Sequence, residues 1–227
     1  MSTKIPAQHP NKSGRKRATL TAAALLGVGA LVTAAAFTDF ALLDLNGSGG
    51  IGGSANKYNI QVSTQSADRA SDVSEKQWVE ANPEAESLDI PGADALIPGG
   101  RSIVAKIPVR NASHTMRSSL DLSLQNTTAP TGNAAEDAKN RAYGQLLHVD
   151  VALLDDASNL SKAAWKPVEM NRFAPGEKSG RVQLDELGAD SGKIAVLRIG
   201  LNSSADDNAA NGGTVAVQAR FDGTAIN

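Results

Sequence analysis

The chain has 227 residues, which is enough for one sizeable domain or two small ones. It contains no cysteine, and this excludes disulfides, thiol nucleophiles and cysteine zinc sites. Hydrophobic residues make up 41% of the chain but aromatic residues only 4%, so we expect a core built mainly from Val, Ile, Leu and Ala.

The charges are unevenly placed along the chain. Residues 1–36 contain no acidic residue, and their five basic residues are Lys4, Lys12, Arg15, Lys16 and Arg17. Without these five of the 22 basic residues, 17 remain against 24 acidic ones, a formal charge of −7. An acidic remainder argues against nucleic acid as a partner, because binding to phosphates needs a basic surface.

An apolar run follows over residues 18–37, "ATLTAAALLGVGALVTAAAF". About 20 residues suffice to cross a bilayer, and the basic residues in front predict a cytoplasmic N-terminus. The run ends in Ala34, Ala35 and Ala36, small residues of the kind after which a signal peptidase cleaves. We therefore expect residues 1–36 to be a signal peptide, inserted transiently in the membrane through 18–37. An uncleaved signal anchor is the alternative, and the rest of the chain is outside in both cases.

A short apolar segment, "FTDFALLDL", comes next and is compatible with a β-strand. Its apolar residues, which need a surface to dock on, are Phe37, Phe40, Leu42, Leu43 and Leu45. The stretch 47–53, "GSGGIGG", is typical of a flexible tether. A phosphate-binding loop is the alternative, but the Lys-Ser/Thr of a P-loop is missing and no helical pattern follows.

Residues 57–227 show short strands separated by polar turns. Alternating apolar residues predict strands around 58–62, 103–109, 120–124, 147–153 and 215–221. Further strands are expected around Trp78 and in "WKPVEM", "GRVQLDEL" and "KIAVLRIGLN", and a short helix at 134–142. Pro108 lacks a backbone N–H, so its strand should be an edge strand or carry a bulge.

Roughly eight to ten strands and no long helix predict an all-β sandwich. We expect it to follow an N-terminal signal helix. The expected organisation is a signal peptide at 1–36, an apolar segment with its tether at 37–56, and the sandwich domain at 57–227.

The junction region resembles that of a known group of exported proteins. "LLGVGALVTAAAFTD" followed by "ALLDLNGS" is similar to the alternate, SipW-type signal peptides of Gram-positive bacteria, a junction shared by the broader TasA/camelysin-like family. "LIPGGRSIVAKIPVRNAS" resembles that family's strand leading into an Asn-containing turn. The resemblance implies cleavage after Ala36, with Phe37 as the new first residue. It also implies a jelly-roll-like antiparallel β-sandwich and a role at the cell surface or in a biofilm matrix, often as fibres. The Ala- and Asp-rich composition suggests an actinobacterial branch.

Residues suited to catalysis or metal binding are scarce. Two histidines follow the apolar run, His114 in a turn and His148 on a strand. His148 and Asp150 share a strand face and could share a metal, but a solvated face is the favoured interpretation. No HExxH motif is present, although camelysin-like relatives have been regarded as metalloproteases. We predict no catalytic residue, no metal site and no cofactor.

Two acidic pairs and two tryptophans are weaker signals. Asp155-Asp156 and Asp206-Asp207 could bind calcium in a loop, since Ca²⁺ takes carboxylate oxygens, but turn-forming and solubilising roles are favoured. Trp78 and Trp165 could stack on sugars, although single tryptophans in a sandwich more often belong to the core or its rim.

The leading hypothesis is an exported, non-enzymatic surface or matrix protein, secreted or held at the cell surface. A sandwich leaves edge strands whose backbone groups can pair with another chain. The apolar segment 37–45 could add to such an edge on a neighbouring copy and build fibres. The expected partners are further copies of the chain, cell-wall or matrix polymers, and a signal peptidase during export. The alternative is a glycan- or wall-binding module, and an enzyme based on carboxylates is the third reading.

Overall fold

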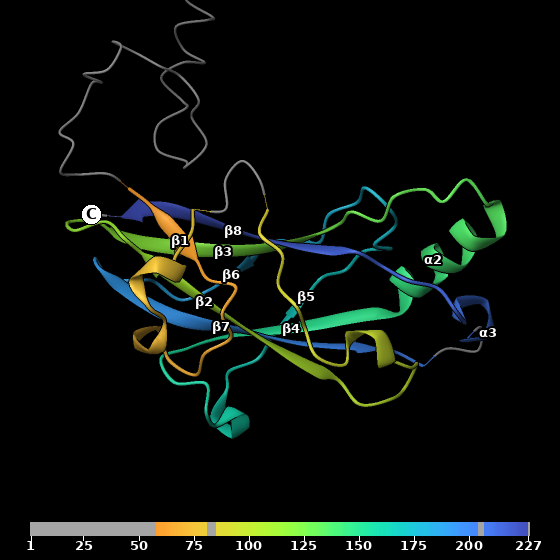
Figure 1. Ribbon diagram of the computed structural model, residues 1–227, viewed down its shortest axis with the longest axis horizontal. Coiled ribbons are helices and arrows are strands. Elements are labelled where there is room, and N and C mark those ends of the chain that lie inside the picture. Colours follow the sequence, from red (N-terminus) through yellow and green to blue (C-terminus); the bar gives the residue numbers. More distant parts are fainter. Residues whose placement is uncertain (1–57, 81–84, 204–206, 227) are drawn as a thin grey trace, which may run out of the picture. The chain divides into compact units, whose positions relative to one another are not determined.

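The computed structural model of the protein describes residues 58–80, 85–203 and 207–226, which form two antiparallel β-sheets (Figure 1). The larger sheet has the strand order β1-β2-β7-β4-β5, with bounds Ile60–Val62, Ile103–Asn111, Ser191–Leu201, Leu147–Leu154 and Lys166–Val168. The smaller sheet has the order β6-β3-β8, with bounds Val182–Gln183, Arg117–Asn126 and Val217–Ile226.

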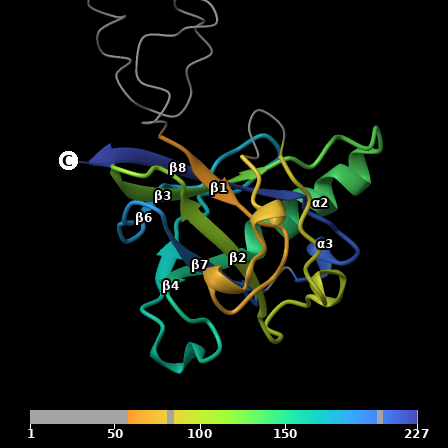
Figure 2. The same cartoon turned by 60° about the vertical axis from the view of Figure 1, so that its left-hand side comes forward.

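The described helices lie in the connections. α2 (Ala134–Leu146) begins after Asn133, whose side chain accepts hydrogen bonds from the N–H groups of Ala135 (3.0 Å) and Glu136 (3.4 Å). α3 (Asp207–Ala210) is a single turn. Figures 1 and 2 show both helices at the end of the sandwich opposite the C-terminal end of β8. The short 3₁₀ helices are η2 (Ala70–Asp72), η3 (Glu75–Gln77), η4 (Ala93–Ala95) and η5 (Leu160–Lys162).

The chain changes sheet at most of its connections. It crosses between β2 and β3, β3 and β4, β5 and β6, β6 and β7, and β7 and β8. It stays within the larger sheet only between β1 and β2 and between β4 and β5. Repeated crossing of this kind is how the chain runs in jelly-roll sandwiches. The structure thus confirms the all-β antiparallel sandwich predicted from the sequence.

The core lies between the two sheets. Leu120, Leu122 and Leu124 of β3 are buried, as are Val149 and Val151 of β4, and all five belong to one apolar cluster. This confirms the predicted alternation, because successive side chains of a strand point to opposite faces. As expected from the composition, most of the cluster is aliphatic.

A smaller apolar cluster covers the other face of the larger sheet. Ile194 and Val196 of β7 pack there with Ala157, and Trp165 lies against them. The connection between β4 and β5 therefore folds back over the outside of its own sheet.

Two local predictions are wrong. Pro108 lies in β2, which is an inner strand between β1 and β7 and not an edge strand. The proline is tolerated because its backbone faces the β1 side where β1 has just ended: Pro108 O accepts a hydrogen bond from Ser63 N (3.1 Å). The segment before Trp78 is not a strand but the turn η3, and Val79 makes only an isolated bridge to Val62.

The predicted helix at 134–142 is confirmed and continues to Leu146. The predicted face of Val215, Val217, Ala219 and Phe221 is present at the end of the chain. Three of these residues pack against the core, whereas Val217 is 41% exposed.

Two buried asparagines end the strands β2 and β3. Asn126 Nδ2 donates to Phe173 O (2.7 Å), and Asn126 Oδ1 accepts from Thr128 N (3.0 Å). Asn111 Nδ2 donates to Met116 O (2.7 Å), and Asn111 Oδ1 accepts from Ser113 N (3.0 Å). Each side chain replaces the backbone partners that the strand loses where it leaves its sheet.

We expect Asn126→Ala to lower the free energy of unfolding by about 3 kcal/mol, because it leaves a buried carbonyl and an N–H without partners. Urea unfolding of the full chain measures this loss. Asn159→Ala is the matched control, since Asn159 is exposed and only accepts from Ser161 N (3.0 Å), a cap worth about 1 kcal/mol. Equal losses in the two variants would contradict a structural role for the buried asparagine.

Candidate functional site

The sequence-predicted site lies outside the described residues. This applies to the cleavage junction at Ala34, Ala35, Ala36 and Phe37, and to the donor residues Phe37, Phe40, Leu42, Leu43 and Leu45. What the structure does describe is the set of strand edges on which such a segment could dock. Within residues 58–80, 85–203 and 207–226, no helix is long and apolar enough to cross a membrane.

β8 is an edge strand with an open stretch. It pairs with β3 on one side only. Ala216 O accepts from Thr127 N (2.9 Å), so the backbone groups of even-numbered residues in β8 face β3 and those of odd-numbered residues face outward. In the described part of the chain, no residue hydrogen-bonds to the outward groups of Val217, Ala219 and Phe221.

The start of the described chain packs on the core-facing side of β8, at Gly223. Gly223 is buried, and a Cβ at this position would overlap the Tyr58 hydroxyl and lie 2.5 Å from Ile60 Cγ1. Tyr58 Oη is hydrogen-bonded to Ser118 Oγ in β3 (2.6 Å). The chain therefore enters the sandwich over the core-facing side of Gly223. The outward backbone groups of Val217, Ala219 and Phe221 have no partner among the described residues. A glycine inside a strand is a sequence signal for such a close approach, and our sequence reading did not use it.

The other edge strands are short or covered. β1 is bound on its outer side by Val79, through Val62 N to Val79 O (2.9 Å) and Val79 N to Val62 O (2.9 Å). β5 has three residues and β6 has two. Short and covered edges of this kind prevent pairing with other chains, so β8 is the edge best suited to accept a strand.

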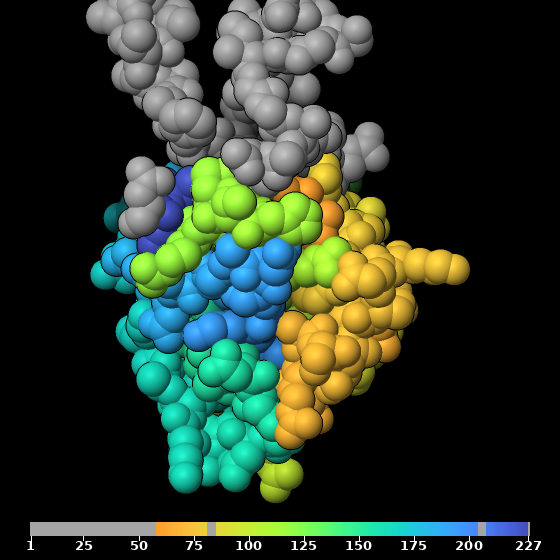
Figure 3. All heavy atoms as spheres, turned by 90° about the vertical axis from the view of Figure 1, so that its left-hand side faces the viewer, coloured from red at the N-terminus to blue at the C-terminus, as the bar shows by residue number. Residues whose placement is uncertain are grey.

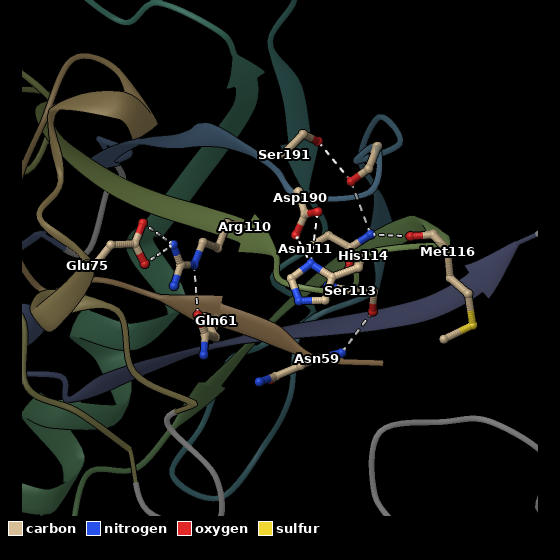
Figure 4. Close-up of polar contacts among 11 residues, drawn as sticks. Asn59, Gln61, Glu75, Arg110, Asn111, Ser113, His114, Met116, Asp190 and Ser191 are labelled. Carbon is tan, nitrogen blue, oxygen red and sulfur yellow. Dashed lines mark hydrogen bonds and ion pairs between the residues drawn. The ribbon is translucent and has the colours of Figure 1, made fainter. Parts of the chain in front are cut away.

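A polar cluster joins the β2–β3 connection to the start of β7 (Figure 4). Asn111 Nδ2 donates to Gly188 O (3.1 Å), and Asp190 N donates to Ser113 O (3.0 Å). His114 Nδ1 lies 2.8 Å from Asp190 Oδ1. Figure 3 shows the same end of the molecule, where the β2–β3 connection in light green lies against the start of β7 in blue.

The cluster contains a histidine and a carboxylate, as a catalytic dyad does. In this structure the pair links two loops. The side chains of His114 and Asp190 are 73% and 56% exposed, so water surrounds the pair. The nearby hydroxyls are engaged elsewhere: Ser113 Oγ accepts from Asn59 N (3.2 Å) and Ser191 Oγ donates to Gly188 O (2.9 Å). The geometry offers no activated nucleophile at this place.

Each of the two tryptophans carries an arginine on one face of its ring. The Arg110 guanidinium lies 4.6 Å from the ring centroid of Trp78, and Arg198 lies 4.5 Å from that of Trp165. Arg110 also binds both carboxylate oxygens of Glu75 (2.9 and 2.8 Å). Trp78 itself is buried, so its ring packs in the structure and is not a platform for a ligand.

His148 and Asp150 do not form a metal site. Asp150 Oδ2 accepts hydrogen bonds from Arg198 Nε (3.1 Å) and Nη2 (2.7 Å). The His148 ring packs over Gly200, and its Nδ1 is buried without a partner. The predicted solvated face is thus partly covered, by Arg198 and Trp165. In the described ranges, no group of three or more potential metal ligands comes together.

The acidic pair Asp155-Asp156 is matched by basic side chains. Asp156 Oδ2 lies 2.5 Å from Arg69 Nη2, and Asp155 Oδ1 lies 3.7 Å from Lys193 Nζ. Hydrogen bonds from Ser158, and then from Arg69, hold the pKa of the Asp156 carboxyl well below its ordinary value. This pair therefore anchors a loop through ion pairs. Asp206 and the side chain of Asp207 lie outside the described part of the structure.

Comparison with known proteins gives no family. No protein-family model matches the chain, and no curated protein matches it significantly. Among solved structures, it is similar to AvmM, which catalyses macrocyclization in alchivemycin A biosynthesis. The identity is 12% and the TM-score 0.31, over 56% of this chain and 66% of that chain. A likeness of this size supports no conclusion about activity.

We expect Gly223→Ala to destabilise the protein by about 1–3 kcal/mol, because the added methyl group meets Tyr58 and Ile60 in a packed site. Denaturant unfolding measures the change. Gly188→Ala is the control, since its Cβ would lie 3.3 Å from the nearest atom, Ser191 Oγ. A Gly223 variant as stable as the parent protein would mean that the chain does not enter the sandwich across this glycine.

Proposed function

We propose that the protein is an exported, non-enzymatic surface or matrix protein that assembles into fibres by N-terminal strand donation. The observation that carries this proposal is the open edge of β8 at residues 217–221. This edge is a suitable acceptor for the apolar segment 37–45. The sequence alone does not indicate where that segment docks. A donor that binds the β8 edge of the next copy makes a head-to-tail contact, and such contacts build filaments.

The lengths are compatible with this contact. The nine residues 37–45 extend to about 30 Å as a strand, which is longer than the open stretch of five residues. Residues 46–57 can span at most about 40 Å. The described chain starts at Tyr58, whose hydroxyl lies over the core-facing side of Gly223 in its own β8. From there, residues 46–57 are long enough for a donor to reach a neighbouring copy.

The polar clusters of the sandwich support a non-enzymatic role. The His114–Asp190 pair ties two connections together, Asp150 is held by Arg198, and Asp156 is held by Arg69. Glycan binding stays an alternative hypothesis, and it would rely on Trp165, because Trp78 is buried under Arg110. Wall-polymer pull-down with Trp165→Ala as control separates the two functions.

A chain that begins at Phe37 should form filaments in electron microscopy, and one that begins at Asn56 should stay monomeric. Ala219→Pro, introduced into the longer chain, should abolish the filaments. It removes an outward-facing N–H of β8 without touching the β3–β8 hydrogen bonds.

Ala219→Ser is the matched control for this test, because it keeps the N–H, and it should form filaments as the parent chain does. If the proline variant assembles normally, β8 is not the acceptor. If the longer parent chain stays monomeric across concentration and pH, strand donation fails altogether.

Export is tested on the natural protein. Mass spectrometry of the protein recovered from culture supernatant should find Phe37 as the first residue, because the small residues 34–36 precede it. Recovery only in membranes, with the segment before residue 36 intact, would support the uncleaved anchor instead.

A further inference from the structure

A cavity of about 150 Å³ opens on the side of the sandwich where β5 faces β6. Its apolar walls come from the end of β4, from the connection that follows it and from the segment after β6: Leu153, Leu154, Ala164 and Leu184. Its charged residues are Lys162, Lys166 and Asp185. The cavity thus combines an apolar floor with charged groups beside it.

Two lysines and one aspartate lie beside the cavity, so their charges do not cancel. Lys166 Nζ donates to Gln183 O (2.9 Å) and lies 3.7 Å from Asp185 Oδ1, so this lysine joins the two sheets and faces a carboxylate. Lys162 makes no ion pair within the part of the chain that the structure describes. One positive charge therefore remains uncompensated next to an apolar surface, which is where the anionic group of an amphipathic ligand is stabilised.

We propose that this cavity binds a compact organic anion, a carboxylate on an apolar body of about six carbon atoms. A volume of about 150 Å³ is that of a cavity which holds a molecule of the size of benzene, so the volume selects a short body. The leucines cover that body, and Lys162 pairs with the carboxylate. The ligand site does not depend on the proposed assembly, because β6 and β8 are the opposite edges of the smaller sheet.

Hexanoate is a suitable probe, and hexanamide and acetate are its matched controls. Titration into the ¹⁵N-labelled full chain should shift the amide signals of Leu153, Leu154 and Leu184 in a saturable way. Hexanamide, which lacks the charge, and acetate, which lacks the body, should each bind at least about tenfold more weakly, a difference of about 1.4 kcal/mol.

Two variants separate the charge from the cavity. Lys162→Gln should weaken hexanoate binding about tenfold, and Ala164→Phe should abolish it by filling the space. Lys178→Gln, an exposed lysine outside the cavity lining, should bind as the parent chain does. Equal binding of hexanoate by the parent, Lys162→Gln and Ala164→Phe chains would overturn the proposal, as would shifts that never saturate. Unchanged unfolding midpoints confirm that the variants are folded.

Discussion

The sandwich depends on satisfying the backbone at the points where its central strands leave their sheets. The chain crosses between sheets at five connections, so strand ends lie against the core, where an unpaired backbone group is costly. Asn111 and Asn126 solve this at the ends of β2 and β3, since an amide side chain supplies both a donor and an acceptor. With the backbone at these two strand ends hydrogen-bonded, the crossings need no further apolar residues. The core between the sheets is then packed mainly with aliphatic side chains.

The hydrogen bonds of the Asn126 side chain also stabilise a strained turn. Asn171, Arg172 and Phe173 all have positive φ (21°, 61° and 24°), a region that residues other than glycine rarely adopt. The turn is held by the bond from Asn126 Nδ2 to Phe173 O and by the complete burial of the Phe173 side chain. Gly144 belongs to this arrangement as well, because a Cβ there would lie 2.7 Å from Phe173 O. The glycine near the end of α2 thus lets the helix approach the turn.

The sequence predicts the parts of the fold that local patterns determine. The alternating leucines of β3 and the valines of β4 are buried as their spacing indicates, and the helix predicted at 134–142 forms and continues to Leu146. Contacts between distant segments explain the errors. Pro108 is accepted in an inner strand because β1 ends one residue earlier, and the segment at Trp78 turns because Arg110 holds Glu75 and the indole ring together. The position of β8 at the edge of its sheet could not be predicted either, since strand order depends on contacts between distant segments.

The edge strands of the sandwich differ in how available they are for pairing with another strand. Three edges are short or bound by a neighbouring segment, which suppresses unspecific pairing, whereas the outward backbone groups of Val217, Ala219 and Phe221 in β8 have no partner among the described residues. Arg220 and Asp222, bonded to each other at 2.7 Å, place polar groups on the outer face of the same strand. β8 therefore turns apolar side chains toward the core and polar side chains toward solvent, and a one-residue slip of its pairing would reverse this alternation.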